Sequence, residues 1–135
     1  MLTTTLAVFL HFLLTEKFVF YTNFLTGSIP TQVGLLVELT RIDIASNELT
    51  GSIPTTFGLL TNMDFMRLTS NKLTGTIPSE LGLLEKATEM FFRSNELYGT
   101  VPDEVCSMAS YSSTLIAVDH CLVECSCCVA SAKRC

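Results

Sequence analysis

Apolar and polar residues alternate over short stretches of this chain, and the pattern recurs every 24 residues. One copy, residues 39–47, reads L-x-x-I-x-I-x-x-N, and residues 63–71 and 87–95 repeat its spacing with Met, Ala or Phe at some apolar positions. Because successive side chains of a β-strand point to opposite faces, each copy predicts a short strand with one buried face. A strand this short cannot bury its apolar face alone. The copies are therefore expected to stack into a parallel sheet over one shared core.

A second phrase follows each strand in the same frame. LTGSIP occurs at residues 25–30 and 49–54, and it returns as LTGTIP at 73–78 and as LYGTVP at 97–102. The glycine permits a tight backbone, and the proline, which lacks an N–H group, suits a position off the main hydrogen-bond ladder. An asparagine two residues before the phrase can bond the otherwise unpaired backbone groups of the turn, coil over coil. This predicted structural ladder consists of Asn23, Asn47, Asn71 and Asn95.

The combined pattern LxxLxLxxNxLTGxIPxxLGxL resembles the plant-type leucine-rich repeat, which occurs in extracellular receptor-like and secreted proteins. The resemblance covers residues from about Thr15 to Cys106. It implies an α/β solenoid, a curved right-handed superhelix of about four to five coils of 24 residues with a parallel β-sheet on its concave face. It also implies a recognition module, receptor-like or secreted, rather than an enzyme.

The repeats divide the chain into three parts. Residues 15–105 hold the leucine-rich repeats, residues 1–14 form an apolar N-terminal segment, and residues 106–135 hold a degenerate last coil and a cysteine-rich C-terminal cap. One more step of 24 predicts a fifth strand and turn over residues 111–121. The N-terminal segment lacks a positive n-region and an A-x-A cleavage site. We therefore interpret it as a degenerate first coil or as part of a longer, truncated array, with a signal peptide as the alternative.

All six cysteines lie in the last part of the chain. An even number crowded into a short terminal segment indicates a cap tied by disulfide bonds, and therefore an oxidising compartment. Zinc held by thiolates is the alternative, although paired CxxC or Cys/His knuckles are absent from the sequence. The disulfide pairing stays open. The predicted disulfide cysteines are Cys106, Cys121, Cys125, Cys127, Cys128 and Cys135.

Charge and composition exclude several classes of protein. The chain has 135 residues, is 48% apolar and carries a formal net charge of −5, which disfavours both a disordered chain and a nucleic-acid-binding protein. With only two histidines and no GxSxG, HExxH or Walker motif, the sequence predicts no catalytic residue, metal site or cofactor. His120 is interpreted as a surface residue at a turn. No apolar run is long enough to span a bilayer, so a membrane would be reached only through a partner or a missing segment.

The remaining place for function is the outward face of the strands. Residues between the buried positions are expected to point to solvent on the concave side, in rows across the strands whose neighbouring members lie about 4.8 Å apart. In these rows Asp43 is placed to pair with Arg67, and a step of 24 sets Ser113 beside Glu89. Arginine and aromatic side chains are favoured contacts at protein interfaces. The predicted ligand-binding residues are Arg41, Asp43, Phe65, Arg67, Glu89, Phe91 and Arg93.

These residues predict a protein or peptide ligand, with a co-receptor as a further candidate partner, at the cell surface or in the extracellular space. The alternative is a structural scaffold, or the C-terminal end of a larger receptor-like repeat protein, without a ligand site of its own. In that case the pair of Asp43 and Arg67 only keeps the sheet soluble, as surface pairs contribute little stability. A third hypothesis is a metal- or redox-active cysteine tail.

Overall fold

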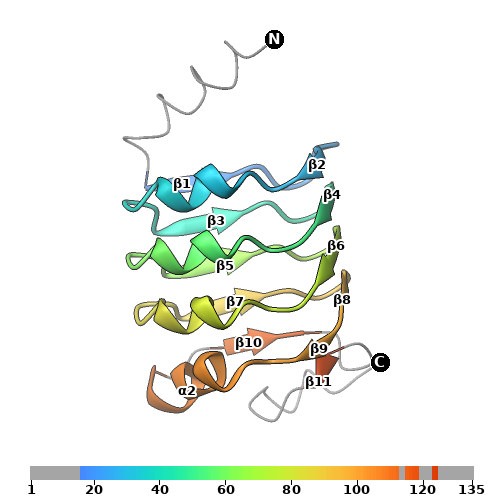
Figure 1. The fold of residues 1–135 in the computed structure, drawn as a ribbon. Helices are drawn as coiled ribbons and strands as arrows, with labels where there is room; N and C mark the ends of the chain where they lie inside the picture. The colour runs from blue at the N-terminus through green and yellow to red at the C-terminus, as the bar shows by residue number, and fades with distance from the viewer. Residues whose placement is uncertain (1–15, 113–114, 119–122, 125–135) are drawn as a thin grey trace.

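The computed structural model describes residues 16–112, 115–118 and 123–124. In this part of the chain each coil adds one strand to a first sheet and one strand to a second, and a short helix then leads to the next coil (Figure 1). The prediction of an α/β solenoid built from stacked parallel strands is confirmed. The apolar N-terminal segment, residues 1–14, lies outside the described residues.

The first sheet has five parallel strands, in the order β1-β3-β5-β7-β10. Neighbouring strands come from successive coils, and each strand is three residues long. The middle residue of each strand faces the core, as the alternation predicts. We call the opposite, outward side the concave face, the name used above. The strands are β1 Lys17–Val19, β3 Arg41–Asp43, β5 Phe65–Arg67, β7 Glu89–Phe91 and β10 Leu115–Ala117.

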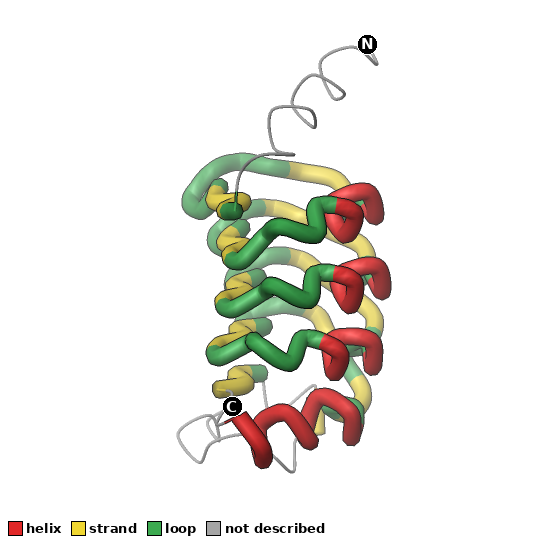
Figure 2. Tube along the Cα trace, turned by 90° about the vertical axis from the view of Figure 1, so that its left-hand side faces the viewer, coloured by secondary structure: helices red, strands yellow, loops and turns green. Residues whose placement is uncertain are grey.

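The LTGSIP phrases form a second parallel sheet. This sheet has four strands in the order β2-β4-β6-β8, and β9 pairs with β11 in a separate two-stranded sheet. Figure 2 shows the two sheets and the helices as separate columns along the stack. The strands are β2 Thr26–Ser28, β4 Glu48–Gly51, β6 Lys72–Gly75, β8 Glu96–Leu97, β9 Gly99–Thr100 and β11 Val123–Glu124.

A short helix follows the proline of each phrase, since the fixed φ of proline suits a helix start. Three of these helices are 3-10 helices, and the last is a longer α-helix. Glycine lets them stack closely: a Cβ added at Gly58 would lie 2.5 Å from the backbone oxygen of Glu80 in the next helix. The helices are η1 Thr31–Leu35, η2 Thr55–Leu59, η3 Ser79–Leu83 and α2 Asp103–Ser112.

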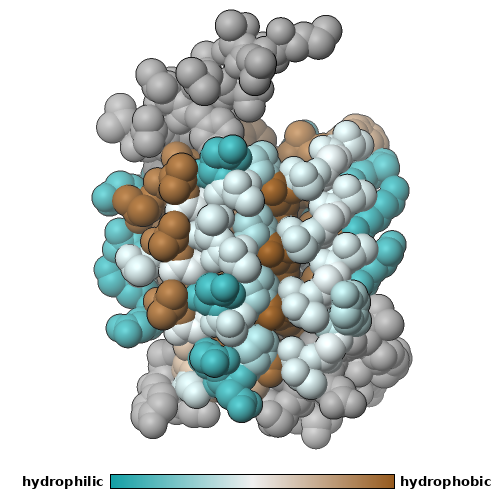
Figure 3. Space-filling model, in the orientation of Figure 1, coloured by the Kyte–Doolittle hydropathy of each residue, from teal (hydrophilic) through white to brown (hydrophobic). Residues whose placement is uncertain are grey.

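One apolar core lies between the three columns. Leu39, Ile42 and Ile44 of a single repeat copy are all buried, and so are the substituted residues Met66 and Phe92. Burying each such side chain contributes about 1.5–3 kcal/mol. The shared core, rather than any single three-residue strand, therefore stabilises the stack. Outside the core, the last residue of each 3-10 helix forms a column of exposed apolar side chains over the helices (Figure 3). These residues are Leu35, Leu59 and Leu83.

Asparagine side chains tie each coil to the preceding one. The Nδ2 of Asn71 donates at 3.0 Å to one carbonyl in its own coil and to one in the preceding coil. Its Oδ1 accepts a hydrogen bond from the N–H of Leu49 at 3.1 Å. Asn47 and Asn95 make the equivalent set, and all three amides are buried. Asn23, in the first described coil, is exposed and donates within its own coil at 3.0 Å.

The last coil departs from the 24-residue frame by two residues. β10 sets Leu115 beside Glu89, a step of 26, whereas each earlier step in this sheet is 24. The expectation that Ser113 stands beside Glu89 is therefore wrong, and Ser113 itself lies outside the described residues. The physical reason is α2, which has 10 residues where each earlier coil has a helix of five. The strand after it consequently begins later in the sequence.

Cys106 lies on α2, is half-buried and is disulfide-bonded. The other five predicted disulfide cysteines, and His120, lie outside the described residues.

Candidate functional site

A buried carboxylate lies on the concave face, at the end of β3. Asp43 accepts two hydrogen bonds from Arg67, Nε to Oδ1 at 2.9 Å and Nη2 to Oδ2 at 2.6 Å. Arg41 adds an ion pair, with its Nη2 3.6 Å from Oδ2, and the N–H of Ala45 lies 3.4 Å from Oδ1. The Asp43 side chain is 2% exposed, whereas both arginine side chains are 37% exposed. The two guanidinium groups therefore cover the carboxylate and stay partly open to solvent.

This burial corrects the expectation that Asp43 points to solvent. The aspartate does occupy an outward position on its strand, beside Arg67 in the register. It is buried because Arg41 and Arg67, which are much longer, close over it from its own strand and from the next. Asp43 thus fixes the orientation of two arginines, and the arginines form the accessible surface.

Aromatic rings extend the arginine pair across the sheet. The Cζ of Arg41 lies 3.7 Å from the ring centroid of Phe65, well within cation–π range. Phe65 packs against Phe91, with ring centroids 5.8 Å apart and an interplanar angle of 56°. The Cζ of Arg67 lies 5.8 Å from the ring centroid of Tyr21. We call this group the concave cluster; it consists of Tyr21, Arg41, Asp43, Phe65, Arg67 and Phe91.

Tyr21 is the member that was not among the predicted ligand-binding residues. It is 53% exposed, and in the 24-residue frame it stands at the same outward position as Arg93. An aromatic residue at an outward position is the sequence feature that could have identified Tyr21 as a binding residue. The predicted residues Glu89 and Arg93 lie on the same face and are half-buried. Glu89 stands beside Phe65 in the register. Within the described part of the chain, neither Glu89 nor Arg93 makes an ion pair.

The concave face is more basic than the chain as a whole. Its outward positions from β1 to the end of the β7 coil carry four cations and two carboxylates, although the formal net charge of the chain is −5. Such a charge contrast favours a ligand that carries negative charge. The cations are Lys17, Arg41, Arg67 and Arg93, and the carboxylates are Asp43 and Glu89.

The face offers hydrogen-bond donors, charge and aromatic surface, which are means of binding rather than of catalysis. Among the described residues, no three His, Cys, Asp or Glu side chains gather in a way that could hold a metal ion. In the same part of the chain, no helix has the length and apolar character needed to cross a bilayer.

Comparison with known proteins places these features in context. The family model described as Leucine Rich Repeat matches residues 38–60. No curated protein sequence matches the chain significantly. Among solved structures, the plant peptide hormone receptor RGFR1 in complex with RGF2 is 33% identical, with a TM-score of 0.68. The match covers 82% of this chain and 17% of the receptor chain.

Two further structures show the same likeness. The LRR ectodomain of the membrane receptor kinase GASSHO1/SCHENGEN3 from Arabidopsis thaliana, in complex with CASPARIAN STRIP INTEGRITY FACTOR 2, is 32% identical with a TM-score of 0.67. This match covers 76% of the chain and 12% of the ectodomain. A plant ice-binding protein is 30% identical with a TM-score of 0.73, over 82% of this chain and 34% of that protein. The chain therefore spans a small part of the length of these proteins.

Proposed function

Because the chain is a plant-type leucine-rich-repeat protein, we propose that it is a non-enzymatic recognition module that binds a protein or peptide ligand through the concave face. The concave cluster carries this proposal. It combines partly exposed guanidinium groups with aromatic rings, the side chains that contribute most binding energy at protein interfaces. The receptors RGFR1 and GASSHO1/SCHENGEN3, which resemble the chain, are described in complex with RGF2 and CASPARIAN STRIP INTEGRITY FACTOR 2.

The arginines of the cluster are held in place before any ligand arrives. Arg67 uses Nε and Nη2 to bind Asp43, which leaves its Nη1 for a ligand acceptor. Arg41 is fixed between Asp43 and the ring of Phe65. A side chain that is already ordered loses less conformational entropy on binding. The ligand that fits best presents a carboxylate to the arginines and an apolar side chain to Phe65 and Phe91.

We place this recognition outside the cell, secreted or at the cell surface, with a co-receptor as a further candidate partner. The disulfide-bonded state of Cys106 supports an oxidising compartment. The complex of BIR3 with SERK2, also similar to this chain, joins two plant proteins and supports the idea of a second protein partner.

Ice binding, the property named for one similar structure, is less well supported. A crystal surface is flat and periodic, so it requires a regular array of similar side chains. The outward face of the second sheet is interrupted by an ion pair, with Lys72 Nζ 3.0 Å from Glu48 Oε2, and by the exposed ring of Tyr98. Recognition of a molecular ligand on the concave face accounts for more of the observations.

The experiment that tests the proposal is selection of a phage-displayed random-peptide library on the full chain with its disulfides intact. Enriched peptides are synthesised and titrated against the wild type, Phe91→Ala and Arg93→Ala. We expect each substitution to weaken binding by about 10-fold, the loss typical of a residue that contributes directly to an interface. Peptides enriched in Asp or Glu, or bound through a free C-terminus, would support the expected charge.

Tyr98→Ala is the control, because it removes an aromatic ring away from the concave face, at an exposed position between β8 and β9. Peptide binding that survives Phe91→Ala and Arg93→Ala but is lost in Tyr98→Ala would place the ligand on another face. Failure to enrich any peptide at all would favour the scaffold hypothesis.

A further inference from the structure

A groove runs along the stack between the helices and the second sheet, away from the concave face (Figure 3). Figure 3 shows it as a hollow with apolar side chains at the bottom and weakly polar side chains on both walls. The part of it that Ser52 to Pro102 line has a volume of about 780 Å³. Three successive coils contribute to it, through the segments that begin at Ser52, Gly75 and Tyr98. An extended ligand lying along the stack would therefore contact every coil in turn.

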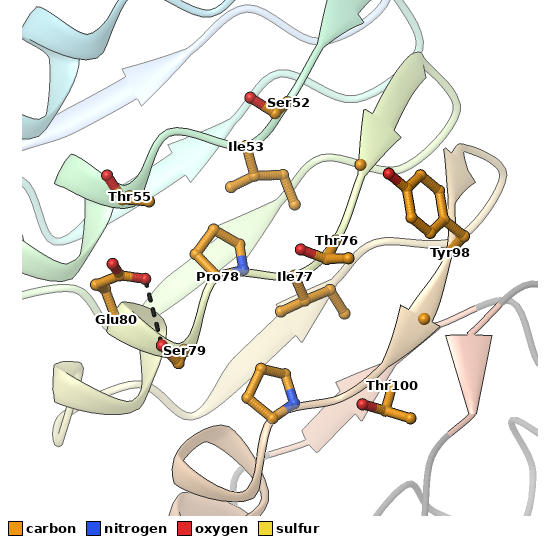
Figure 4. Close-up of a pocket in the computed structure, with 13 residues that line it drawn as sticks. Ser52, Ile53, Thr55, Thr76, Ile77, Pro78, Ser79, Glu80, Tyr98 and Thr100 are labelled. Atoms are coloured by element: carbon orange, nitrogen blue, oxygen red, sulfur yellow. Dashed lines mark hydrogen bonds between the residues drawn. The ribbon is translucent and has the colours of Figure 1, made fainter.

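The walls of this hollow are rich in free hydroxyl groups. Ser52, Thr55, Thr76 and Thr100 line it from three coils, and they are exposed (Figure 4). Within the described residues, no hydrogen bond occupies any of these four hydroxyls. Each hydroxyl can donate one hydrogen bond and accept two, and it can rotate to suit its partner. The hollow thus offers donors and acceptors together, without a fixed polarity.

An aromatic ring stands at the rim of the hollow (Figure 4). Tyr98 is 59% exposed, and its N–H donates to the carbonyl of Gly75 at 2.9 Å, which sets it beside Thr76, the residue that directly follows β6. In the three earlier copies of the phrase the same position is threonine, at Thr26, Thr50 and Thr74. The ring therefore distinguishes the last copy of the phrase from the earlier copies. Nothing in the repeat requires it, because a smaller side chain serves the same position in the preceding coils.

The charge of the lining restricts the ligand. Among the described residues, no Lys, Arg or His lines the hollow, and Glu80 is the one charged residue of its lining. A phosphate, a sulfate or an acidic sugar would find no cation there and would be repelled by this carboxylate. The bottom consists of Ile53, Ile77 and the prolines of the phrase, which supply contact surface without polar groups. The ligand must therefore be neutral and must carry both hydroxyls and an apolar face.

We propose that this groove binds a neutral oligosaccharide, with the sugar ring stacked on Tyr98 and its hydroxyls bonded to Thr76 and Ser52. Sugars combine a C–H face, which packs on an aromatic ring, with hydroxyls that donate and accept at once. A peptide strand fits less well, because its apolar side chains would need deeper pockets than an open hollow provides. The site is independent of the concave face, so it can be present whether or not the concave cluster binds a peptide.

The test titrates the full, disulfide-intact chain with four neutral probes, cellohexaose, xylohexaose, mannohexaose and maltohexaose, and with an oligogalacturonide as the acidic comparison. Binding is measured by saturation-transfer-difference NMR, up to about 10 mM sugar, because open sites bind weakly. We expect at least one neutral probe to bind. Tyr98→Thr, which restores the residue of the earlier coils, should lower the affinity for that probe by about 10-fold. Tyr98→Phe should keep the affinity within about 3-fold of the wild type.

Two further variants separate this site from the rest of the molecule. Thr76→Val keeps the shape of the side chain but removes the hydroxyl, and it should weaken sugar binding by at least about 3-fold. Phe91→Ala alters only the concave cluster and should leave sugar binding unchanged. The inference is overturned if no neutral probe binds, if the oligogalacturonide binds as tightly as the neutral probes, or if Tyr98→Thr binds like the wild type. Unchanged thermal unfolding of the Tyr98 variants shows that a loss of binding is local.

Discussion

Arg67→Ala removes the main partner of a buried carboxylate. In the folded chain Asp43 receives two hydrogen bonds from Arg67, and the Asp43 side chain is 2% exposed. After the substitution the nearest groups are Arg41 at 3.6 Å and the N–H of Ala45 at 3.4 Å, both beyond good hydrogen-bond distance. The folded state would then hold a weakly compensated charge that the unfolded chain hydrates fully. The substitution is therefore expected to lower the free energy of unfolding.

The known costs of breaking a buried and an exposed ion pair bound the expected loss of unfolding free energy. Removing one partner of a fully buried ion pair costs about 3–5 kcal/mol, and an exposed pair contributes about 0–1 kcal/mol. Because Arg67 is 37% exposed, water screens part of the pair, and the expected loss is about 2 kcal/mol. Lys72→Ala is the matched control. Lys72 pairs with Glu48 of the preceding coil, with Nζ 3.0 Å from Oε2. The Lys72 side chain is 56% exposed and the Glu48 side chain is 50% exposed. The control should lose less than about 0.5 kcal/mol.

Urea unfolding followed by far-UV circular dichroism measures both changes, without reductant so that disulfides persist. The midpoints are comparable if the dependence of the unfolding free energy on urea is the same in each variant. The double variant Asp43→Ala/Arg67→Ala should be more stable than Arg67→Ala alone, because it removes the buried charge together with its partner. If Arg67→Ala loses no more stability than Lys72→Ala, the carboxylate is not buried as described and the cluster does not hold its arginines in place.

Four further substitutions test the scaffold by the same unfolding assay. Asn71→Ala should cost about 2–4 kcal/mol, since it leaves several buried backbone groups unpaired, and a loss below about 1 kcal/mol would contradict the ladder. Gly58→Ala should cost about 1–3 kcal/mol because the new Cβ meets the backbone of Glu80, and an unchanged midpoint would show that the helices can separate freely. Leu60→Ala should cost about 2–5 kcal/mol and Leu59→Ala less than about 0.5 kcal/mol, and equal losses would refute the assigned burial.

Periodicity made most of the fold predictable from the sequence. Each repeat has the same apolar, asparagine, glycine and proline columns, and every column has one physical role that the structure repeats in each coil. The buried middle residues of the strands, such as Ile42 and Met66, follow directly from alternation. The pairing of Asp43 with Arg67 follows from a step of 24 in a parallel sheet.

Two features depended on information that periodicity does not carry. The change from a five-residue 3-10 helix to the ten-residue α2 shifts β10 by two residues, and no repeated column marks that change. The burial of Asp43 depends on the conformations of two long arginine side chains, which strand alternation does not describe. Tyr21 joins the cluster for the same reason: its ring is reached by Arg67 from a strand two coils away.

Both candidate sites occupy positions that the repeat leaves free to vary. The columns that pack the core or close the turns hold similar residues in every coil, because a change there would cost stability. The column of Arg41, Phe65 and Glu89 instead holds a different residue in each coil, and Tyr98 stands in a column of threonines. Side chains in such columns can change binding at little cost to the fold. Phe91→Ala should therefore impair peptide binding and should lose far less unfolding free energy than truncation of a core leucine such as Leu60. If Phe91→Ala and Leu60→Ala lose similar unfolding free energies, this division between scaffold and binding columns does not hold.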